Sequence, residues 1–471
     1  MMLVEDLICK ILLINCCVAA ICKKKYIKEF VEALKLMVKV QIVRKKFLWK
    51  NDFLFPAVIW LASRIFIWTA MLLIAPKLPL PAEEFLPRFG WGVIDAWDSM
   101  HYRAIATSGY EFVNDGKQHN LAFFPLFPLS IWVLMKLGLP FELAGTLVNN
   151  LAFFAALYSL YFWIKENYGI NAAQWTTAVV SLYPSSMFTG VIYTEGLYLF
   201  LSTSALRAFD QKQYGWTALW GAMATATRPT GMALIPAFAI AAWKERRPPI
   251  AYIAGFTTAI GILLFSLYCA IYFGNPLAFI EAQRGWRPTL GFDWQGWLNM
   301  LMQILVGTKN WQYGWVQNPS GGIQDPWYLL LFGVIVTSSY LLWRFRQRLS
   351  SVKLFYGFYA LVLLLLILAS EEWINNLLNL FMVLGGGYML WRLHTQLTAV
   401  TVIYGFCGIG LLLASGGTIS LSRLAYGIVP LNIAIGVLLS RHPRQGYLIL
   451  GAFVTLLAKI AVGFAQERWV G

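Results

Sequence analysis

The sequence predicts an all-α, polytopic membrane protein, and three observations support this fold class. Of the 471 residues, 59% are hydrophobic and only 13% are charged, whereas a soluble globular chain carries about 25% charged residues. Many apolar runs reach the ~17–25 residues that a helix needs to cross a bilayer. Basic residues gather in some turns and are balanced by acidic residues in others, which is typical of turns that alternate between the two sides of a membrane.

The net charge of +15 does not indicate a nucleic-acid-binding protein, because much of it is concentrated near the N-terminus. Ten Lys or Arg and only two Glu fall within residues 23–50. Positive charge directly before the first long apolar run is typical of the cytoplasmic side. We therefore expect residues 1–52 to form a basic cytoplasmic or interfacial segment that contacts membrane lipids. The six Cys residues show neither a disulfide framework nor the spacing of a metal site.

Apolar runs after residue 52 predict about 11–13 transmembrane helices in total. The first long run contains Arg64, an arginine that would face a polar cavity or a partner helix. The expected spans are 53–75, 142–164, 172–190, 195–209, 214–227, 230–243, 250–273, 326–343, 353–370, 374–391, 396–414, 424–440 and 446–464.

Two long loops divide these spans, and their charge places both outside the cytoplasm. The loop 76–141 has five basic and six acidic residues, and the loop 274–325 has three of each. The apolar run 122–139 is placed within the first loop as a re-entrant helix, because a full crossing would give the following turns the wrong charge. The predicted organisation is a core module over 53–273 with a catalytic outer loop at 76–141, a second outer loop at 274–325, and C-terminal transmembrane helices over 326–471.

The residues 91–128 form the densest cluster of polar and ionisable side chains in this apolar chain. Asp95 and Asp98 lie three positions apart, which on a helix would place both carboxylates on one face. His101 and Tyr102 follow about one turn later, and Arg103 comes next. Tryptophans flank the carboxylates, and tryptophan is enriched where membrane meets water. The cluster predicts a carboxylate site at the membrane surface, on the non-cytoplasmic side.

Several motifs resemble those of the PIG-V family, the GPI mannosyltransferase 2 type of GT-C glycosyltransferase. They are WDSMHYRAIATSGY followed by FFPLFP, then LYPSSMFTGVIYTEGL, ATATRPTG, NPLAFIEAQRGW and SRLAYGIVP. The resemblance extends over about residues 53–440, and its late elements resemble bacterial relatives. It implies a GT-C-type helical bundle with large outer loops after the first and seventh core spans. The charge pattern places long loops at these same two positions.

The resemblance also implies a reaction, namely transfer of a hexose, expected to be mannose, from a polyprenyl-phosphate donor to a lipid or glycan acceptor. Such a transfer needs a base for the acceptor hydroxyl and cations for the leaving phosphate. Asp98 is the first candidate for the base, because the Trp-Asp pair carries the match, and Asp95 is the second. Either carboxylate could instead cap a helix or pair with Arg103. His101 is a candidate to orient the acceptor or the base, or is hydrogen-bonded structure.

The candidate substrate-binding residues lie in turns expected on the same side as Asp98. Arg423 is the first candidate for the donor phosphate, with Arg284 and Arg287 as alternatives. Glu195 would bind sugar hydroxyls or cap a helix, Arg228 would bind phosphate or act as a structural pin, and Tyr102 completes the set. No cofactor and no bound metal are expected, because the sequence has no paired His/Cys or Asp-x-Asp constellation. The Asp-x-x-Asp spacing of Asp95 and Asp98 leaves a shared metal as the alternative.

Two other classes of function remain open from the sequence. One is a flippase or exporter of lipid-linked oligosaccharide, which should carry charged residues on several helices at mid-membrane depth. The other is a ligase or polymerase of surface glycan with a diphosphate-linked donor. The late motifs favour a bacterial plasma membrane, with the endoplasmic reticulum membrane as the eukaryotic equivalent. A role like that in GPI-anchor biosynthesis would apply only to a eukaryotic chain.

Overall fold

The computed structural model describes residues 52–78, 90–287, 291–311, 323–368 and 370–470. The predicted segment 1–52 therefore lies outside the described residues except for its last residue. Within these ranges the regular structure is helical, apart from one isolated bridge between Gly291 and Ser415. The predicted all-α class is confirmed.

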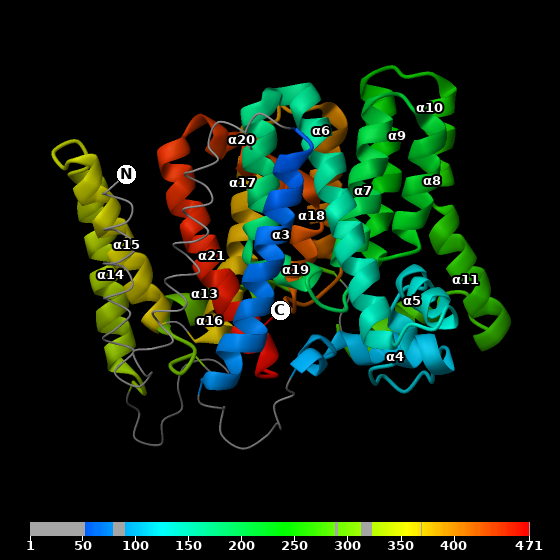
Figure 1. The fold of residues 1–471 in the computed structure, drawn as a ribbon, viewed down its shortest axis with the longest axis horizontal. Helices are drawn as coiled ribbons and strands as arrows, with labels where there is room; N and C mark the ends of the chain where they lie inside the picture. The colour runs from blue at the N-terminus through cyan, green and yellow to red at the C-terminus, as the bar shows by residue number, and fades with distance from the viewer. Residues whose placement is uncertain (1–51, 79–89, 288–290, 312–322, 369, 471) are drawn as a thin grey trace.

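Most of the helices belong to one bundle, in which the long ones stand side by side (Figure 1). They are α3 (Leu54–Thr69), α6 (Phe141–Leu182), α7 (Glu195–Asp210), α8 (Tyr214–Thr225), α9 (Leu234–Lys244), α10 (Pro249–Thr257), α11 (Ile260–Phe273), α14 (Pro326–Arg344), α15 (Ser351–Leu368), α16 (Glu371–Leu380), α17 (Gly386–Arg392), α18 (Ala399–Ala414), α20 (Val429–Arg441) and α21 (Pro443–Ala465).

The other helices connect these elements. They are α4 (Asp98–Ser108), α5 (Leu126–Lys136), α12 (Ala278–Ala282), α13 (Trp294–Val306) and α19 (Leu421–Tyr426), with short π or 3-10 turns η2 (Ala70–Ile74), η3 (Ala75–Lys77), η4 (Gly90–Ile94), η5 (Asn120–Ala122), η6 (Pro184–Thr189), η7 (Pro229–Ala233), η8 (Gln283–Gly285) and η9 (Phe381–Gly385). Of these, α4 and α5 lie at the lower end of the bundle in Figure 1.

Five helical segments of the described chain are long and apolar enough to cross a membrane by length and composition. They cover Leu54–Lys77, Phe141–Leu182, Pro249–Phe273, Pro326–Arg344 and Pro443–Ala465. The chain is therefore an integral membrane protein, as predicted. The shorter helices overlap the other expected spans, whose number stays a prediction.

The turns group at two ends of the bundle in the way that the charge pattern predicts. In Figure 1 the turns α9–α10, α14–α15 and α20–α21 lie at the upper end, whereas α4 and α5 lie at the lower end. Basic residues lie in or beside each of the three upper turns, among them Lys244, Arg346 and Arg441, and basic turns are typical of the cytoplasmic side. Helix α5 has 11 residues, about half the length needed to span a bilayer, and it packs against α4 and α6. This placement agrees with a re-entrant segment in the first outer loop.

Helix α6 contains two of the predicted spans, separated at Gly169. This glycine has φ 85° and ψ 170°, a conformation that side-chain-bearing residues rarely adopt. The chain reverses there, so α6 is a helical hairpin. Its second half ends at Leu182, whereas the sequence predicted a span to residue 190. That boundary is wrong because Pro184 follows closely, and the residue before a proline disfavours the helical conformation.

The chain from Tyr183 to Thr194 contains only short turns, yet all of it is buried. Non-helical backbone at membrane depth requires polar partners inside the protein, and Asn149 of α6 supplies several. Its Nδ2 donates to the carbonyls of Phe188 at 2.8 Å and Val191 at 2.7 Å, and its Oδ1 accepts from the N–H of Gly196 at 2.7 Å. Asn149 therefore fixes the position from which α7 begins.

Arg64 of α3 anchors the same segment from the other side. Its guanidinium donates to Asn150 Oδ1 at 3.1 Å and to Thr189 Oγ1 at 2.8 Å. It also lies over the ring of Phe153, 4.9 Å from the centroid. The side chain is fully buried, so this arginine connects α3 to α6 and η6, as expected for an intramembrane arginine with a partner helix.

We expect Gly196→Ala to lower the free energy of unfolding by roughly 1–3 kcal/mol, because the site has no room for a methyl group. A Cβ at Gly196 would lie 2.3 Å from the backbone oxygen of Asn149 and 3.0 Å from Phe153 Cβ. Denaturation of the purified protein in mixed detergent micelles measures the effect. Gly215→Ala is the control, because no heavy atom lies within 4 Å of its Cβ position. Equal stability of the two variants would contradict the prediction.

Candidate functional site

Asp98 is the first residue of α4, and the residue before it has an unusual backbone conformation. Trp97 has φ 58° and ψ −120°, which is rare for a bulky residue. Asp95 precedes this turn and lies just after η4, outside the helix. The prediction that both carboxylates share one helix face is therefore wrong, because the chain changes direction between them.

Asp98 is one of four charged side chains that contact one another in a row, with negative and positive charges alternating. Its Oδ2 lies 2.8 Å from Nη1 of Arg423, and Nε of Arg423 lies 3.5 Å from Oε1 of Glu195. The same Oε1 lies 2.9 Å from Nη1 of Arg228. We call Asp98, Arg423, Glu195 and Arg228 the ion network. The structure thus brings together four residues that the sequence analysis selected from distant segments.

Little of the ion network is exposed, so removal of one charge would leave its partner buried without an opposite charge. The side chain of Glu195 is 1% exposed, and that of Arg423 is 12% exposed. Burial alone would lower the pKa of Arg423, but the attraction of Asp98 and Glu195 outweighs burial and raises this pKa. The guanidinium also lies 5.2 Å from the ring centroids of both Phe188 and Tyr193. Arg423 is therefore held as a permanent cation.

The segment before α7 completes the surroundings of Asp98. The hydroxyl oxygen of Tyr193 accepts a hydrogen bond from the backbone N–H of Asp98 at 3.4 Å. The N–H of Ile192 bonds to the carbonyl of Ile94, which joins this segment to η4. Sequence reasoning named neither Tyr193 nor Phe188 as a site residue, although both belong to the motif that contains Glu195. Their proximity to Arg423 depends on the fold rather than on a sequence pattern.

Asp95 belongs to a second group of polar side chains. Its Oδ1 accepts from Ser99 Oγ at 2.7 Å, and its Oδ2 pairs with Arg103. Arg103 also pairs with Glu142 of α6 at 2.7 Å, and its guanidinium lies over the ring of Phe141. This arrangement matches the structural alternative from the sequence, in which one carboxylate pairs with Arg103. It connects α4 to the start of α6.

His101 lies in a group of aromatic rings that connects the two outer loops. Its ring stacks on Phe123 with centroids 4.6 Å apart, and Trp286 contacts it edge-on at 5.5 Å. Burial lowers the pKa of the His101 imidazole, although nearby Asp98 partly opposes this effect. The imidazole is therefore neutral at pH 7. Tyr102 is buried and packs edge-on against Phe123 and Phe127.

The two candidate arginines of the second loop differ in their environment. Arg287 is half-buried, hydrogen-bonds to Ser415 Oγ, and donates from Nη2 to the carbonyl of Ile419 at 3.2 Å. Burial, together with repulsion from Arg423, lowers the pKa of Arg287 to about 10. Arg284 is exposed. The sequence gave no signal for Ser415 or Ile419, because a hydroxyl and a backbone carbonyl in a distant loop form no motif.

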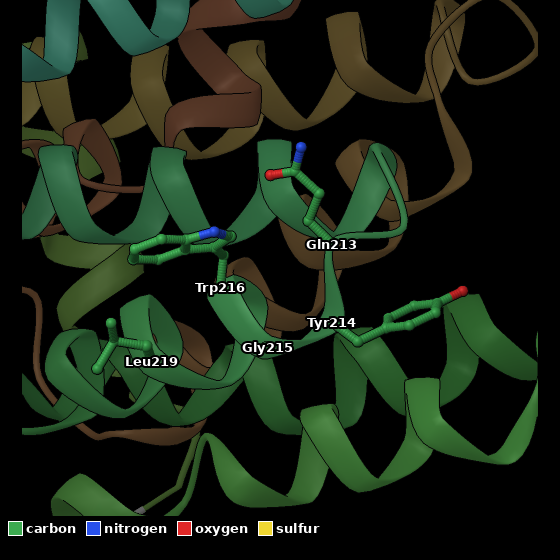
Figure 2. A pocket seen from close by; sticks show the side chains of 5 residues that line it. All are labelled: Gln213, Tyr214, Gly215, Trp216 and Leu219. Carbon is green, nitrogen blue, oxygen red and sulfur yellow. The ribbon is translucent and has the colours of Figure 1, made fainter.

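A surface hollow lies away from these residues, at the other end of α8. Figure 2 shows its lining, where the rings of Tyr214 and Trp216 point to opposite sides. The hollow has a volume of about 640 Å³ and is lined by Gln213, Tyr214, Gly215, Trp216 and Leu219. It contains no carboxylate or cationic side chain, whereas Arg228 follows the opposite end of the same helix. The ion network is therefore the better candidate for chemistry.

Comparison with known proteins identifies the family. A family model described as Mannosyltransferase (PIG-V) matches residues 43–279, that is 279 − 43 + 1 = 237 of the 471 residues. The chain belongs to the PIG-V mannosyltransferase family. The family expected from the motifs is confirmed. Asp98, Glu195 and Arg228 lie inside the matched range, whereas Arg287 and Arg423 lie beyond it.

Individual PIG-V relatives are similar over part of their length. The chain is 22% identical to GPI alpha-1,6-mannosyltransferase 2 of Cricetulus griseus over 263 residues, which is 48% of this chain and 52% of the relative. It is 30% identical to GPI mannosyltransferase 2 of Cryptococcus neoformans over 149 residues, covering 29% of this chain and 34% of the relative. The chain thus spans about half or less of the curated relatives that it matches.

Two solved structures match the chain at low identity and with TM-scores below 0.5. The Archaeoglobus fulgidus oligosaccharyltransferase has a TM-score of 0.41 at 12% identity, over 88% of this PIG-V family chain and 53% of the other. ArnT from Cupriavidus metallidurans, solved with undecaprenyl phosphate, has a TM-score of 0.35 at 14% identity, over 83% of this chain and 78% of the other.

Proposed function

We propose that this protein is an integral-membrane glycosyltransferase of the mannosyltransferase type. It transfers a hexose from a polyprenyl-phosphate donor to a lipid or glycan acceptor at the non-cytoplasmic face of the membrane. The observation that carries the proposal is the 2.8 Å contact between Asp98 and Arg423. A candidate base and a candidate phosphate-binding cation occupy one buried site, and membership of the PIG-V family supports this reading.

The chemistry needs few groups. Asp98 accepts the proton of the acceptor hydroxyl while the hydroxyl oxygen forms a bond to the anomeric carbon. The bond between that carbon and the phosphate oxygen breaks, and its electrons leave with the phosphate. General-base assistance contributes typically ~10²–10⁴-fold to such a step. A guanidinium stabilises the developing phosphate charge through planar, charge-assisted hydrogen bonds.

The distribution of buried charge supports a transferase rather than a flippase. In the part of the chain that the structure describes, the buried charged residues are Arg64, Asp95, Glu195 and Arg228. Three of these four belong to the ion network or to the neighbouring Asp95 group. A flippase would be expected to carry such groups along several helices at mid-membrane depth.

The test is transfer of radiolabelled mannose by membranes that contain the full chain. The donor is polyprenyl-monophosphate mannose, the acceptor is the endogenous lipid pool, and Asp98→Asn membranes are the control. Mild acid cleaves the donor but should leave the labelled product intact. We expect this product from membranes with the wild-type chain and not from the Asp98→Asn membranes. Movement of label across the membrane without a new glycosidic bond would favour the flippase. Transfer from a diphosphate-linked donor alone would favour the ligase or polymerase.

The proposal places the ion network on the non-cytoplasmic side, and cysteine labelling can test this sidedness. In a cysteine-free background, a single cysteine at Lys117, in the exposed loop after α4, should react with an impermeant maleimide in intact cells. A cysteine at Lys244, in the α9–α10 turn, should react only after permeabilisation, because basic turns stay in the cytoplasm. Labelling of both positions from the same side would contradict the predicted topology.

The proposal also includes the membrane in which the protein lies. The late motifs support a bacterial plasma membrane, and the equivalent eukaryotic location is the endoplasmic reticulum membrane. In a bacterium the acceptor would be a lipid or glycan other than a GPI precursor. Mass spectrometry of the labelled product identifies this acceptor.

A further inference from the structure

Arg423 and Arg287, two of the candidate arginines for the donor phosphate, differ in one respect that sequence reasoning missed. Arg423, the first candidate for the donor phosphate, already contacts the carboxylates of Asp98 and Glu195. Arg287 contacts only neutral acceptors, Ser415 Oγ and the carbonyl of Ile419. Within the described ranges, no carboxylate lies within ion-pair distance of Arg287. Among the described residues, therefore, no carboxylate neutralises the positive charge of Arg287 by a direct ion pair.

The backbone holds Arg287 close to Arg423. The carbonyl that accepts from Arg287 belongs to Ile419, and α19, which carries Arg423, begins two residues later at Leu421. The N–H of Gly291 also bonds to the carbonyl of Ala414, so the second outer loop is joined to the loop between α18 and α19. Repulsion from Arg423 contributes to the lowered pKa of Arg287, as expected for two nearby cations.

The charges of these five residues can be counted directly. Arg228, Arg287 and Arg423 contribute three positive charges, and Asp98 and Glu195 contribute two negative charges, so the sum is 3 − 2 = +1. A sugar linked through a phosphodiester carries about one negative charge, which matches this sum. A diphosphate-linked sugar carries about two.

We propose that Arg287 and Arg423 together bind the single phosphate of the donor, and that Arg423 exchanges Asp98 for the leaving phosphate when Asp98 takes the acceptor proton. This inference rests on the proposed function. It names Arg287 as a substrate-binding residue and Arg423 as a cation that changes its partner during the reaction.

The exchange keeps the site electrically balanced throughout the reaction. When the acceptor proton moves to Asp98, its charge is lost and the sum for the protein becomes 3 − 1 = +2. At the same moment the phosphodiester becomes a phosphate monoester, whose charge at pH 7 is about −1.5 to −2. The Asp98–Arg423 pairing loses its electrostatic attraction just as the leaving oxygen gains charge. Proton transfer thus frees the guanidinium for the leaving group.

The first experiment measures binding of polyprenyl-phosphate mannose and of a polyprenyl-diphosphate-linked sugar to the purified full chain in detergent, together with transfer activity. We expect the wild-type protein to prefer the sugar linked through a monophosphate. Arg287→Gln should weaken monophosphate binding roughly 10–100-fold, and Arg287→Lys should weaken it less, because lysine keeps the charge but not the planar fork. Lys309→Gln, which removes an exposed charge from the same outer loop, is the matched control.

The outcomes separate this inference from the proposed function. Absence of binding and transfer in the wild-type protein would overturn both. A wild-type protein that transfers mannose, with Arg287→Gln binding the monophosphate normally, would overturn only the inference. Loss of monophosphate binding in Arg284→Gln instead of Arg287→Gln would also overturn it. Thermal unfolding of each variant establishes that weaker binding does not reflect misfolding.

A second variant tests the exchange of partners. Asp98→Asn imitates the neutral, protonated carboxyl, so the site should carry +2 and resemble the site after proton transfer. We expect this variant to lose transfer activity and yet bind polyprenyl monophosphate several-fold more tightly than the wild-type protein. The tighter binding of polyprenyl monophosphate should disappear in the double variant Asp98→Asn/Arg287→Gln. Unchanged or weaker monophosphate binding by a folded Asp98→Asn variant would overturn the exchange.

Discussion

Asp98→Asn is expected to lower the rate of transfer by about 10²–10⁴-fold, the usual contribution of a general base. Asparagine keeps the size of the side chain and can still hydrogen-bond to Arg423, but it cannot take a proton. The stability of the protein should change far less than its activity, because Arg423 still contacts Glu195 at 3.5 Å. Single-turnover transfer of labelled mannose by the purified protein measures the effect without interference from product release.

Asp95→Asn is the matched comparison, since it makes the same chemical change three residues away. Asp95 already contacts Ser99 and Arg103, and Arg103 keeps Glu142 as a second partner. We expect this variant to retain most of its transfer rate. If Asp95→Asn were inactive and Asp98→Asn active, the base would be Asp95. If both were active, the carboxylates would be structural and the proposed mechanism would fail.

Much of the fold could be predicted because membrane-spanning helices have a strong physical signature. Long apolar runs and the distribution of basic residues gave the span positions from 53–75 onward, and helices cover them in the structure. The main departure lies at residues 183–194, where the chain is buried but not helical. Hydropathy could not reveal this, because the segment is apolar. Its backbone partners come from Asn149, which lies in another helix.

The candidate site was predictable in its members but not in its pairings. Charge alternation suggested that the turns carrying Asp98, Glu195, Arg228 and Arg423 share one side of the membrane, and the structure brings these four residues together. Whether Asp95 points toward Asp98 depends on the backbone at Trp97, whose positive φ no propensity predicts. Which arginine contacts a carboxylate depends on packing between distant helices, so sequence reasoning could not separate Arg287 from Arg423.

Glu195→Gln should lower the free energy of unfolding by roughly 3–5 kcal/mol, the usual effect of removing one partner from a buried ion pair. The Glu195 side chain is 1% exposed, and it pairs with Arg228, whose side chain is 8% exposed. Without this negative charge, Arg228 keeps a neutral amide oxygen as acceptor and the ring of Tyr198, 5.7 Å from the guanidinium carbon. A buried cation with no anionic partner is costly, because it has lost its hydration without compensation.

The double variant Glu195→Gln/Arg228→Met distinguishes this electrostatic penalty from a loss of packing. Replacing both members of a buried ion pair by uncharged groups often changes stability little. The second substitution should therefore recover most of the stability that Glu195→Gln removes. The control is Glu166→Gln, which breaks the ion pair of Glu166 with Arg207 at 2.7 Å, where the Glu166 side chain is 46% exposed. Glu166→Gln should lower the free energy of unfolding by at most about 1 kcal/mol. Denaturation in mixed micelles measures all three variants, and a Glu195→Gln loss no larger than the Glu166→Gln loss would show that the buried ion network does not stabilise the fold.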